Sequence, residues 1–131
     1  MPVKHNNETV NGPGYAKNPD HQVNCENVTI DIKVSAAGVL LSRAQNAILL
    51  TETGYSPQYY VPRSAINFDA LKEISLSTYC PFKGQARYWA IKDDEEDTPV
   101  LWGYDDPYLE VKQLSACAAF YTDRVEFRVT E

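Results

Sequence analysis

Hydrophobic and polar residues alternate along parts of this chain with the two-residue period of a β-strand. In residues 27–35, every second residue from Val28 to Val34 is Val or Ile, and the residues between them are polar. Residues 125–130 repeat the pattern, with apolar side chains at every second position from Val125. Because successive side chains of a strand point to opposite faces, both stretches predict strands with one buried face.

Shorter apolar runs, separated by residues that favour turns, predict the remaining strands. They are expected at 39–42, 47–52, 58–61, 100–104 and 116–121, with 43–46 as a turn between the first two. Helical spacing is confined to 66–73, and 108–114 is expected to be a short helix or a loop. Many short strands favour a mainly β fold, a small closed or nearly closed antiparallel barrel with one or two short helical segments.

Residues 75–92 predict a β-hairpin around which the rest of the chain is organised. One strand ends at Cys80, residues Pro81 to Gly84 form the turn, and the second strand begins at Gln85. Proline favours an early turn position, and glycine supplies a positive φ near the end of a turn. This loop pairs Cys80 with Gln85 and gives the hairpin one face that grades from apolar to polar toward the turn. We expect either a pocket mouth or a solvated hairpin end there.

Length and charge narrow the class of protein. A chain of 131 residues fits one domain. We expect a polar, irregular N-terminal arm over 1–26 and a single β-domain over 27–131. The net charge of -6 argues against general binding of nucleic acid or of an anionic membrane surface. No Asp or Glu lies between Ile74 and Lys92, so Lys83 and Arg87 occupy a locally positive window.

The cysteines, histidines and known motifs predict neither a metal site nor another cofactor. The three Cys residues are scattered and form no CxxC pair, which disfavours zinc and disulfides and fits a reducing cytoplasm. His5 and His21 lie in the polar arm and are expected to be solvated. The acidic run 93–97 lacks the spacing of a calcium loop and is expected to be a solvated hairpin tip. Phosphate-binding loops, serine elbows and HExxH are absent from the sequence.

Glu52 is the carboxylate best placed for acid–base chemistry, because it ends an apolar run. The alternative is an ordinary surface acid or a partner for Arg63. Cys80 lies three residues before Lys83, and a nearby cation lowers the pKa of a thiol. The absence of His from the predicted strands nevertheless disfavours a Cys–His nucleophile.

Four segments together resemble an uncharacterised family, the domain-of-unknown-function family numbered four hundred and twenty-seven. The segments are Thr-Glu-Thr at 51–53, Tyr-Tyr-Val-Pro-Arg at 59–63, Thr-Tyr-Cys-Pro-Phe-Lys-Gly-Gln-Ala-Arg-Tyr-Trp at 78–89, and Trp-Gly-Tyr-Asp-Asp-Pro at 102–107 with Ala-Phe-Tyr-Thr-Asp-Arg-Val at 119–125. The resemblance covers about residues 25–130 and implies a β-tent domain, broadly similar to the ligand-binding domain of cereblon and to methionine sulfoxide reductase B.

The resemblance implies no activity and no metal for this chain. The β-tent relatives often carry paired zinc knuckles, whose cysteines this sequence lacks. Some catalogues label the family nucleotidyltransferase-like. The sequence lacks the Gly-Ser and paired-Asp pattern of a metal-dependent nucleotidyltransferase.

We therefore expect a cytoplasmic domain with a pocket at the central hairpin that accepts a small anionic organic ligand. Lys83 and Arg63 would hold the anionic group, and Glu52, Lys83, Arg63 and Tyr88 are expected to converge on one cavity. The catalytic candidates are Glu52 and Lys83, and the ligand-binding candidates are Tyr60, Arg63, Thr78, Cys80, Tyr88 and Tyr104. The first alternative is an enzyme of group transfer or hydrolysis, with Glu52 as acid–base group and Lys83 as electrostatic stabiliser. The second is a protein-interaction module that recognises a peptide at a sheet edge.

Overall fold

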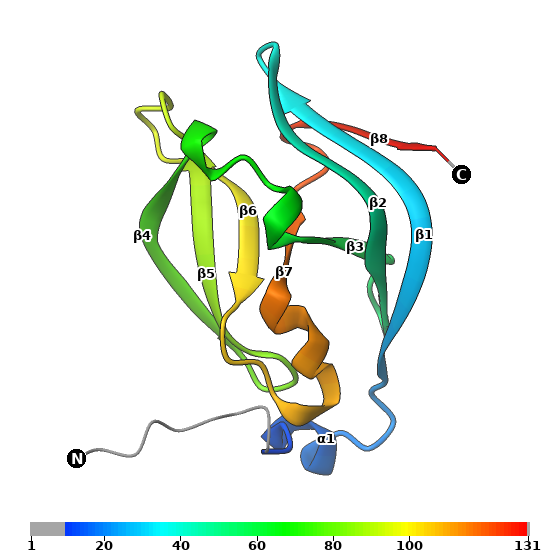
Figure 1. Cartoon of the computed structure of the whole chain (residues 1–131). Coiled ribbons are helices and arrows are strands. Elements are labelled where there is room, and N and C mark those ends of the chain that lie inside the picture. Colours follow the sequence, from blue (N-terminus) through cyan, green and yellow to red (C-terminus); the bar gives the residue numbers. More distant parts are fainter. Residues whose placement is uncertain (1–9, 131) are drawn as a thin grey trace, which may run out of the picture.

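The computed structural model describes residues 10–130, in which eight antiparallel strands form one open sheet (Figure 1). The strands are β1 (Val23–Ala36), β2 (Val39–Glu52), β3 (Gln58–Pro62), β4 (Leu71–Cys80), β5 (Gly84–Ile91), β6 (Pro99–Tyr104), β7 (Cys117–Phe120) and β8 (Glu126–Thr130). Their order in the sheet is β4-β5-β6-β7-β3-β2-β1-β8. The predicted mainly β class is confirmed. The predicted closure into a barrel is wrong, because β4 and β8 remain as edges.

The helical segments are short. They are α1 (Pro13–Lys17) and the 3₁₀ helices η2 (Arg63–Ala65), η3 (Phe68–Ala70) and η4 (Leu109–Ala116). The expected helix over 66–73 is reduced to η3, since the chain enters β4 at Leu71. None of the helices in the described part of the chain is long and apolar enough to cross a membrane.

The sheet folds into two halves that face each other across the core. In Figure 1, β4, β5 and β6 stand on one side, β1, β2 and β8 on the other, and β3 and β7 lie between them. One core cluster includes Ile32, Val34 and Phe120, whose side chains are fully buried. The second cluster contains Tyr60 and Leu114 and borders the site described below.

The β1–β2 hairpin is longer than the sequence pattern predicts. The expected turn at 43–46 does not exist, because β2 runs unbroken to Glu52. The polarity at Gln45 and Asn46 instead marks an irregularity in the pairing, where Thr29 pairs with Asn46 but Ile32 pairs with Ala44. One extra residue of β1 fits into this interval, and such a bulge interrupts strict alternation without ending the strand.

The central hairpin forms, but its register differs from the predicted one by one residue. Cys80 pairs with Gly84 instead of Gln85, and Thr78 pairs with Ala86. Gly84 has a φ of 116°, so the positive φ belongs to the first residue of β5 and the loop holds three residues. A slip of one residue exchanges the two faces of a strand. Thr78 therefore shares a face with Tyr88 instead of Arg87.

Candidate functional site

A buried ion pair joins β2 to the β4–β5 turn. The Lys83 ammonium donates a hydrogen bond to Oε1 of Glu52. Only 11% of the Lys83 side chain and 7% of the Glu52 side chain are exposed. Ionised groups are seldom buried to this degree, because their transfer out of water is costly unless each is paired. The two halves of the sheet thus meet at a charged contact, and interactions elsewhere in the fold offset its desolvation cost.

The ion pair lies at a cavity of about 470 Å³ between the two halves of the sheet. This volume is typical of small-molecule sites. Six of the lining residues are aromatic, and Glu52 and Lys83 are the charged ones. The lining residues are Leu50, Glu52, Tyr55, Ser56, Gln58, Tyr60, Lys83, Tyr88, Trp102, Tyr104 and Tyr121.

Two hydroxyls in the cavity wall, those of Tyr60 and Tyr88, are held by neighbours. The Trp102 indole N–H donates to the Tyr60 hydroxyl over 3.1 Å. The hydroxyls of Thr78 and Tyr88 lie 2.7 Å apart and share a hydrogen bond. The Tyr104 hydroxyl makes no hydrogen bond to any residue of the described range 10–130. Burial raises the pKa of Tyr60 and of Tyr104. Tyr104 is therefore a neutral phenol with a free O–H donor at the cavity.

His21 completes the charged cluster, although the sequence pattern gives no sign of it. Its Nε2 lies 2.8 Å from Oε2 of Glu52, and its ring stacks on Phe82 with centroids 4.0 Å apart. The side chain is 17% exposed, so the expectation of a solvated His21 is wrong. His5 lies outside the described residues. Neither polarity nor spacing could have revealed His21, because its partner is 31 positions away.

Arg63 does not join the cavity, contrary to its expected place beside Lys83. Its Nε donates to the Cys117 carbonyl over 3.0 Å, and its Nη1 donates to Asp105 over 2.6 Å. Its guanidinium also lies over the Trp89 ring, 5.7 Å from the centroid. Arg87 pairs with Asp105 as well. This network occupies the cation that was expected to hold an anionic ligand.

The other predicted site residues divide into two groups. Glu52, Lys83 and Tyr88 meet at the cavity, as Tyr60 and Tyr104 also do. Thr78 and Cys80 do not line it. Thr78 reaches the cavity wall only through its hydrogen bond to Tyr88, and Cys80 is a partly exposed free cysteine.

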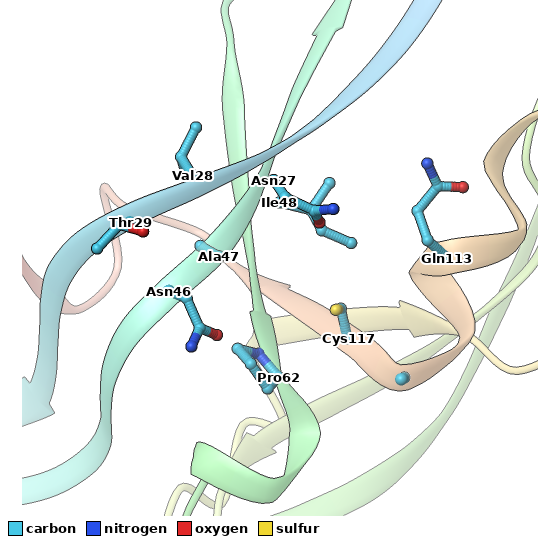
Figure 2. A pocket seen from close by; sticks show the side chains of 10 residues that line it. Asn27, Val28, Thr29, Asn46, Ala47, Ile48, Pro62, Gln113 and Cys117 are labelled. Carbon is cyan, nitrogen blue, oxygen red and sulfur yellow. The ribbon is translucent and has the colours of Figure 1, made fainter.

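A second cavity of about 390 Å³ lies beside the β1–β2 hairpin (Figure 2). In Figure 2, Asn27, Gln113 and Cys117 approach it from three different elements. Burial raises the pKa of the Cys117 thiol, which is therefore neutral at physiological pH. The lining residues are Asn27, Val28, Thr29, Asn46, Ala47, Ile48, Pro62, Gln113, Ala116 and Cys117, and none of them carries a charge. The Glu52–Lys83 cavity is accordingly the better candidate for chemistry.

Within residues 10–130, no group of three or more His, Cys, Asp or Glu side chains is placed to hold a metal ion. What the first cavity offers is a carboxylate, an ammonium, a free phenol and aromatic walls. Such a set can stack a ring, donate hydrogen bonds to an oxygen acceptor and exchange a proton.

The comparisons with known proteins identify a family but no activity. A family model described as a domain of unknown function (DUF427), with a nucleotidyltransferase-like label, matches residues 24–131. The resemblance seen in four sequence segments is thereby confirmed. Comparison with the curated proteins finds no match. The matched range contains every residue of the cavity wall, whereas His21 lies before it.

Proposed function

This chain belongs to the DUF427 family, and we propose that it binds a small aromatic molecule in the cavity beside Glu52 and Lys83. The observation that carries the proposal is the buried ion pair in the lining of a cavity that six aromatic side chains also line. Aromatic side chains favour the offset or edge-on stacking of another ring, and a cavity of this volume admits a ligand of one or two rings.

The polar end of the ligand is an oxygen acceptor. A lysine ammonium has three N–H donors, and the contact with Glu52 uses one of them. The free hydroxyl of Tyr104 adds a further donor at the same cavity. Since Glu52 compensates the charge of Lys83, the site is less positive than the sequence suggested. It accepts a neutral carbonyl as well as a carboxylate, and it disfavours an ammonium.

Three compounds that share one ring system test this proposal: 2-naphthoate, 2-naphthamide and 2-naphthylmethylamine. Binding is followed by ¹⁵N NMR, in which the Trp102 indole N–H reports on the cavity wall and Trp89, in the other core cluster, is the internal control. We expect saturable shifts at Trp102 for the acid and the amide, and weaker ones for the amine. Equal binding of all three, or no shift at Trp102, would refute the proposal.

A conservative variant connects binding to the named donor. Tyr104→Phe removes a hydroxyl that has no hydrogen-bond partner within residues 10–130, so the fold should stay intact. The variant should weaken binding of the acid and the amide about tenfold, as the loss of one hydrogen bond to the ligand implies. Tyr59→Phe is the matched control, because Tyr59 stacks on Phe127 and lies outside the cavity. An unchanged affinity in Tyr104→Phe would exclude Tyr104 as the donor.

The second candidate function is enzymatic, in group transfer or hydrolysis, with Glu52 as the acid–base group and Lys83 stabilising negative charge. It is favoured by the fixed orientation of Glu52, whose two oxygens contact Lys83 and His21 separately. Release of 2-naphthol from 2-naphthyl acetate, present in the wild type and lost in Glu52→Gln, would support it. If no naphthol is released, binding stands as the leading function.

The edges of the sheet give less support to a peptide-binding module. The pairing of β4 with β5 is irregular between Ile74 and Ser77, and β8 is five residues long. Strand addition works best on a long, regular edge.

As to location, the three free cysteines favour a reducing compartment, and we propose the cytoplasm.

A further inference from the structure

Residues 10–22 lie against the β4–β5 turn and form what we call the N-terminal strap. The backbone N–H of Gly14 donates to the Pro81 carbonyl over 3.1 Å. The Tyr15 hydroxyl donates to the Phe82 carbonyl over 3.0 Å. These bonds attach the strap to the turn that presents Lys83.

The far ends of the strap are fixed as well. The backbone N–H of Gly12 donates to the Glu110 carboxylate over 2.9 Å, so the start of the strap is held at η4. At its other end, the N–H of Thr53 donates to the Gln22 carbonyl over 3.0 Å, beside Glu52. The strap is thus anchored on both halves of the sheet that enclose the cavity.

Close packing of a glycine shows that the fit is specific. A Cβ added to Gly14 would lie 2.7 Å from the Phe82 ring, closer than nonbonded carbon atoms approach. Phe82 also stacks on His21, so the strap contacts the Phe82 ring through both Gly14 and His21. The consequence is that His21 is held in place from two sides, by Phe82 and by Glu52.

We propose that the N-terminal strap supports the ligand site from outside the cavity wall and that His21, through Glu52, is a positioning residue that sets the charge preference of the ligand. The inference rests on the proposed function. An ionised carboxylate only accepts hydrogen bonds, so His21 donates through Nε2–H to Glu52. Lys83 compensates the charge of Glu52 through Oε1, and His21 caps the other oxygen, Oε2, so that neither oxygen is left as a free acceptor at the cavity. Without His21, Oε2 loses its donor, and this uncapped acceptor disfavours a carboxylate ligand and favours an ammonium.

The family match does not assign this role, because it begins at residue 24. The strap therefore adds a histidine to a cavity whose walls all come from the matched range. In this proposal, His21 selects the charge of the ligand from outside the matched range, and the aromatic walls within that range bind its ring.

The test compares the affinities of 2-naphthoate and 2-naphthylmethylamine in the full chain. His21→Phe keeps a ring to stack on Phe82 but loses the donor to Glu52. We expect the preference for the acid over the amine to fall about tenfold or more in this variant, while 2-naphthamide binds as in the wild type. His21→Gln places an amide N–H near the same position and should restore most of the preference.

Gly14→Ala supplies a second route to the same result. Its Cβ displaces the strap at Phe82 while His21 remains in the sequence, so the preference should shift in the same direction as in His21→Phe. This variant also serves if His21→Phe does not fold. An unchanged preference in every folded variant, with the wild type binding normally, would overturn the role of the strap and leave the proposed function standing. A wild type that binds none of the three compounds would overturn the proposed function itself.

Discussion

Removing Lys83 should destabilise the domain, because its partner would remain buried. Lys83→Met keeps most of the aliphatic stem and deletes only the charge. Breaking a buried ion pair from one side costs about 3–5 kcal/mol, since the other charge is left uncompensated. His21 still holds Glu52 at 2.8 Å and recovers part of that cost. We therefore expect a loss of about 2–3 kcal/mol in the free energy of unfolding.

Urea titration followed by circular dichroism measures this loss, and the slope of the transition should match that of the wild type. In thermal unfolding, a loss of this size lowers the midpoint by about 6–10 °C for a domain of this length. The control is Lys72→Met, because Lys72 pairs with Asp97 at an exposed hairpin tip. Exposed pairs contribute about 0–1 kcal/mol, so this variant should stay close to the wild type.

The double variant Glu52→Gln/Lys83→Met separates the ion pair from the packing of its side chains. With both charges gone, no carboxylate is left unpaired, so the double variant should be more stable than Lys83→Met alone. Two results would refute the argument. One is a loss below about 0.5 kcal/mol in Lys83→Met, which is typical of a solvated pair. The other is a loss in the double variant that equals the sum of the losses in Glu52→Gln and Lys83→Met.

Two further predictions concern the backbone and acid stability. Gly84→Ala should cost about 1–3 kcal/mol in the free energy of unfolding, because Gly84 has a φ of 116° and an added Cβ would lie 3.3 Å from the Asp106 carbonyl oxygen. The control is Gly38→Ala, at a φ of 78° in open space, which should cost clearly less in the same urea titration. Equal costs would contradict this account. The pKa of Asp105 is lowered, since hydrogen bonds from Arg63 and Arg87 outweigh the opposing effect of burial. A carboxyl whose pKa is lower in the folded than in the unfolded protein stabilises the fold at pH values above the unfolded pKa of about 3.9. This stabilisation is lost as the pH falls through the folded pKa. The urea concentration at the unfolding midpoint should thus decrease at pH values below about 4, and it should decrease less steeply in Asp105→Asn. Parallel pH curves for the two proteins would rule out this contribution.

The strand content of this fold could be predicted from local pattern, and its closure could not. Alternation over 27–35 and the turn residues around Pro81 gave β1 and the central hairpin because each depends on neighbours in sequence. Whether β4 and β8 pair depends on the twist and length of the whole sheet, which no local pattern records. The one-residue register error has a similar origin, since either Gln85 or Gly84 could begin β5 and only the φ of Gly84 decides.

Part of the candidate site was also accessible from sequence. Glu52 ends an apolar run and Lys83 lies in a window free of acids. Each therefore needed an oppositely charged partner from another segment, and a contact between the two could be predicted. Arg63 was misplaced because its partner Asp105, which it contacts at 2.6 Å, lies 42 residues away, and no local pattern shows that pairing. The burial of Lys83 could not be predicted from the sequence, because its side chain is only 11% exposed through contacts that are distant in the chain.

A buried ion pair is weak evidence that the two charges are there for stability, so Glu52 and Lys83 invite a functional explanation. An apolar pair of similar volume in place of a buried ion pair is often as stable or more so. Glu52 and Lys83 therefore cost the domain stability that hydrophobic side chains would supply, and His21 offsets some of that cost from outside the matched range. A carboxylate held by two nitrogen donors, beside a phenol with no hydrogen-bond partner in residues 10–130, is the arrangement on which the proposed ligand binding rests. The same three side chains that make the domain sensitive to Lys83→Met are those that would read the charge of that ligand, so stability and charge preference should change together in this cluster.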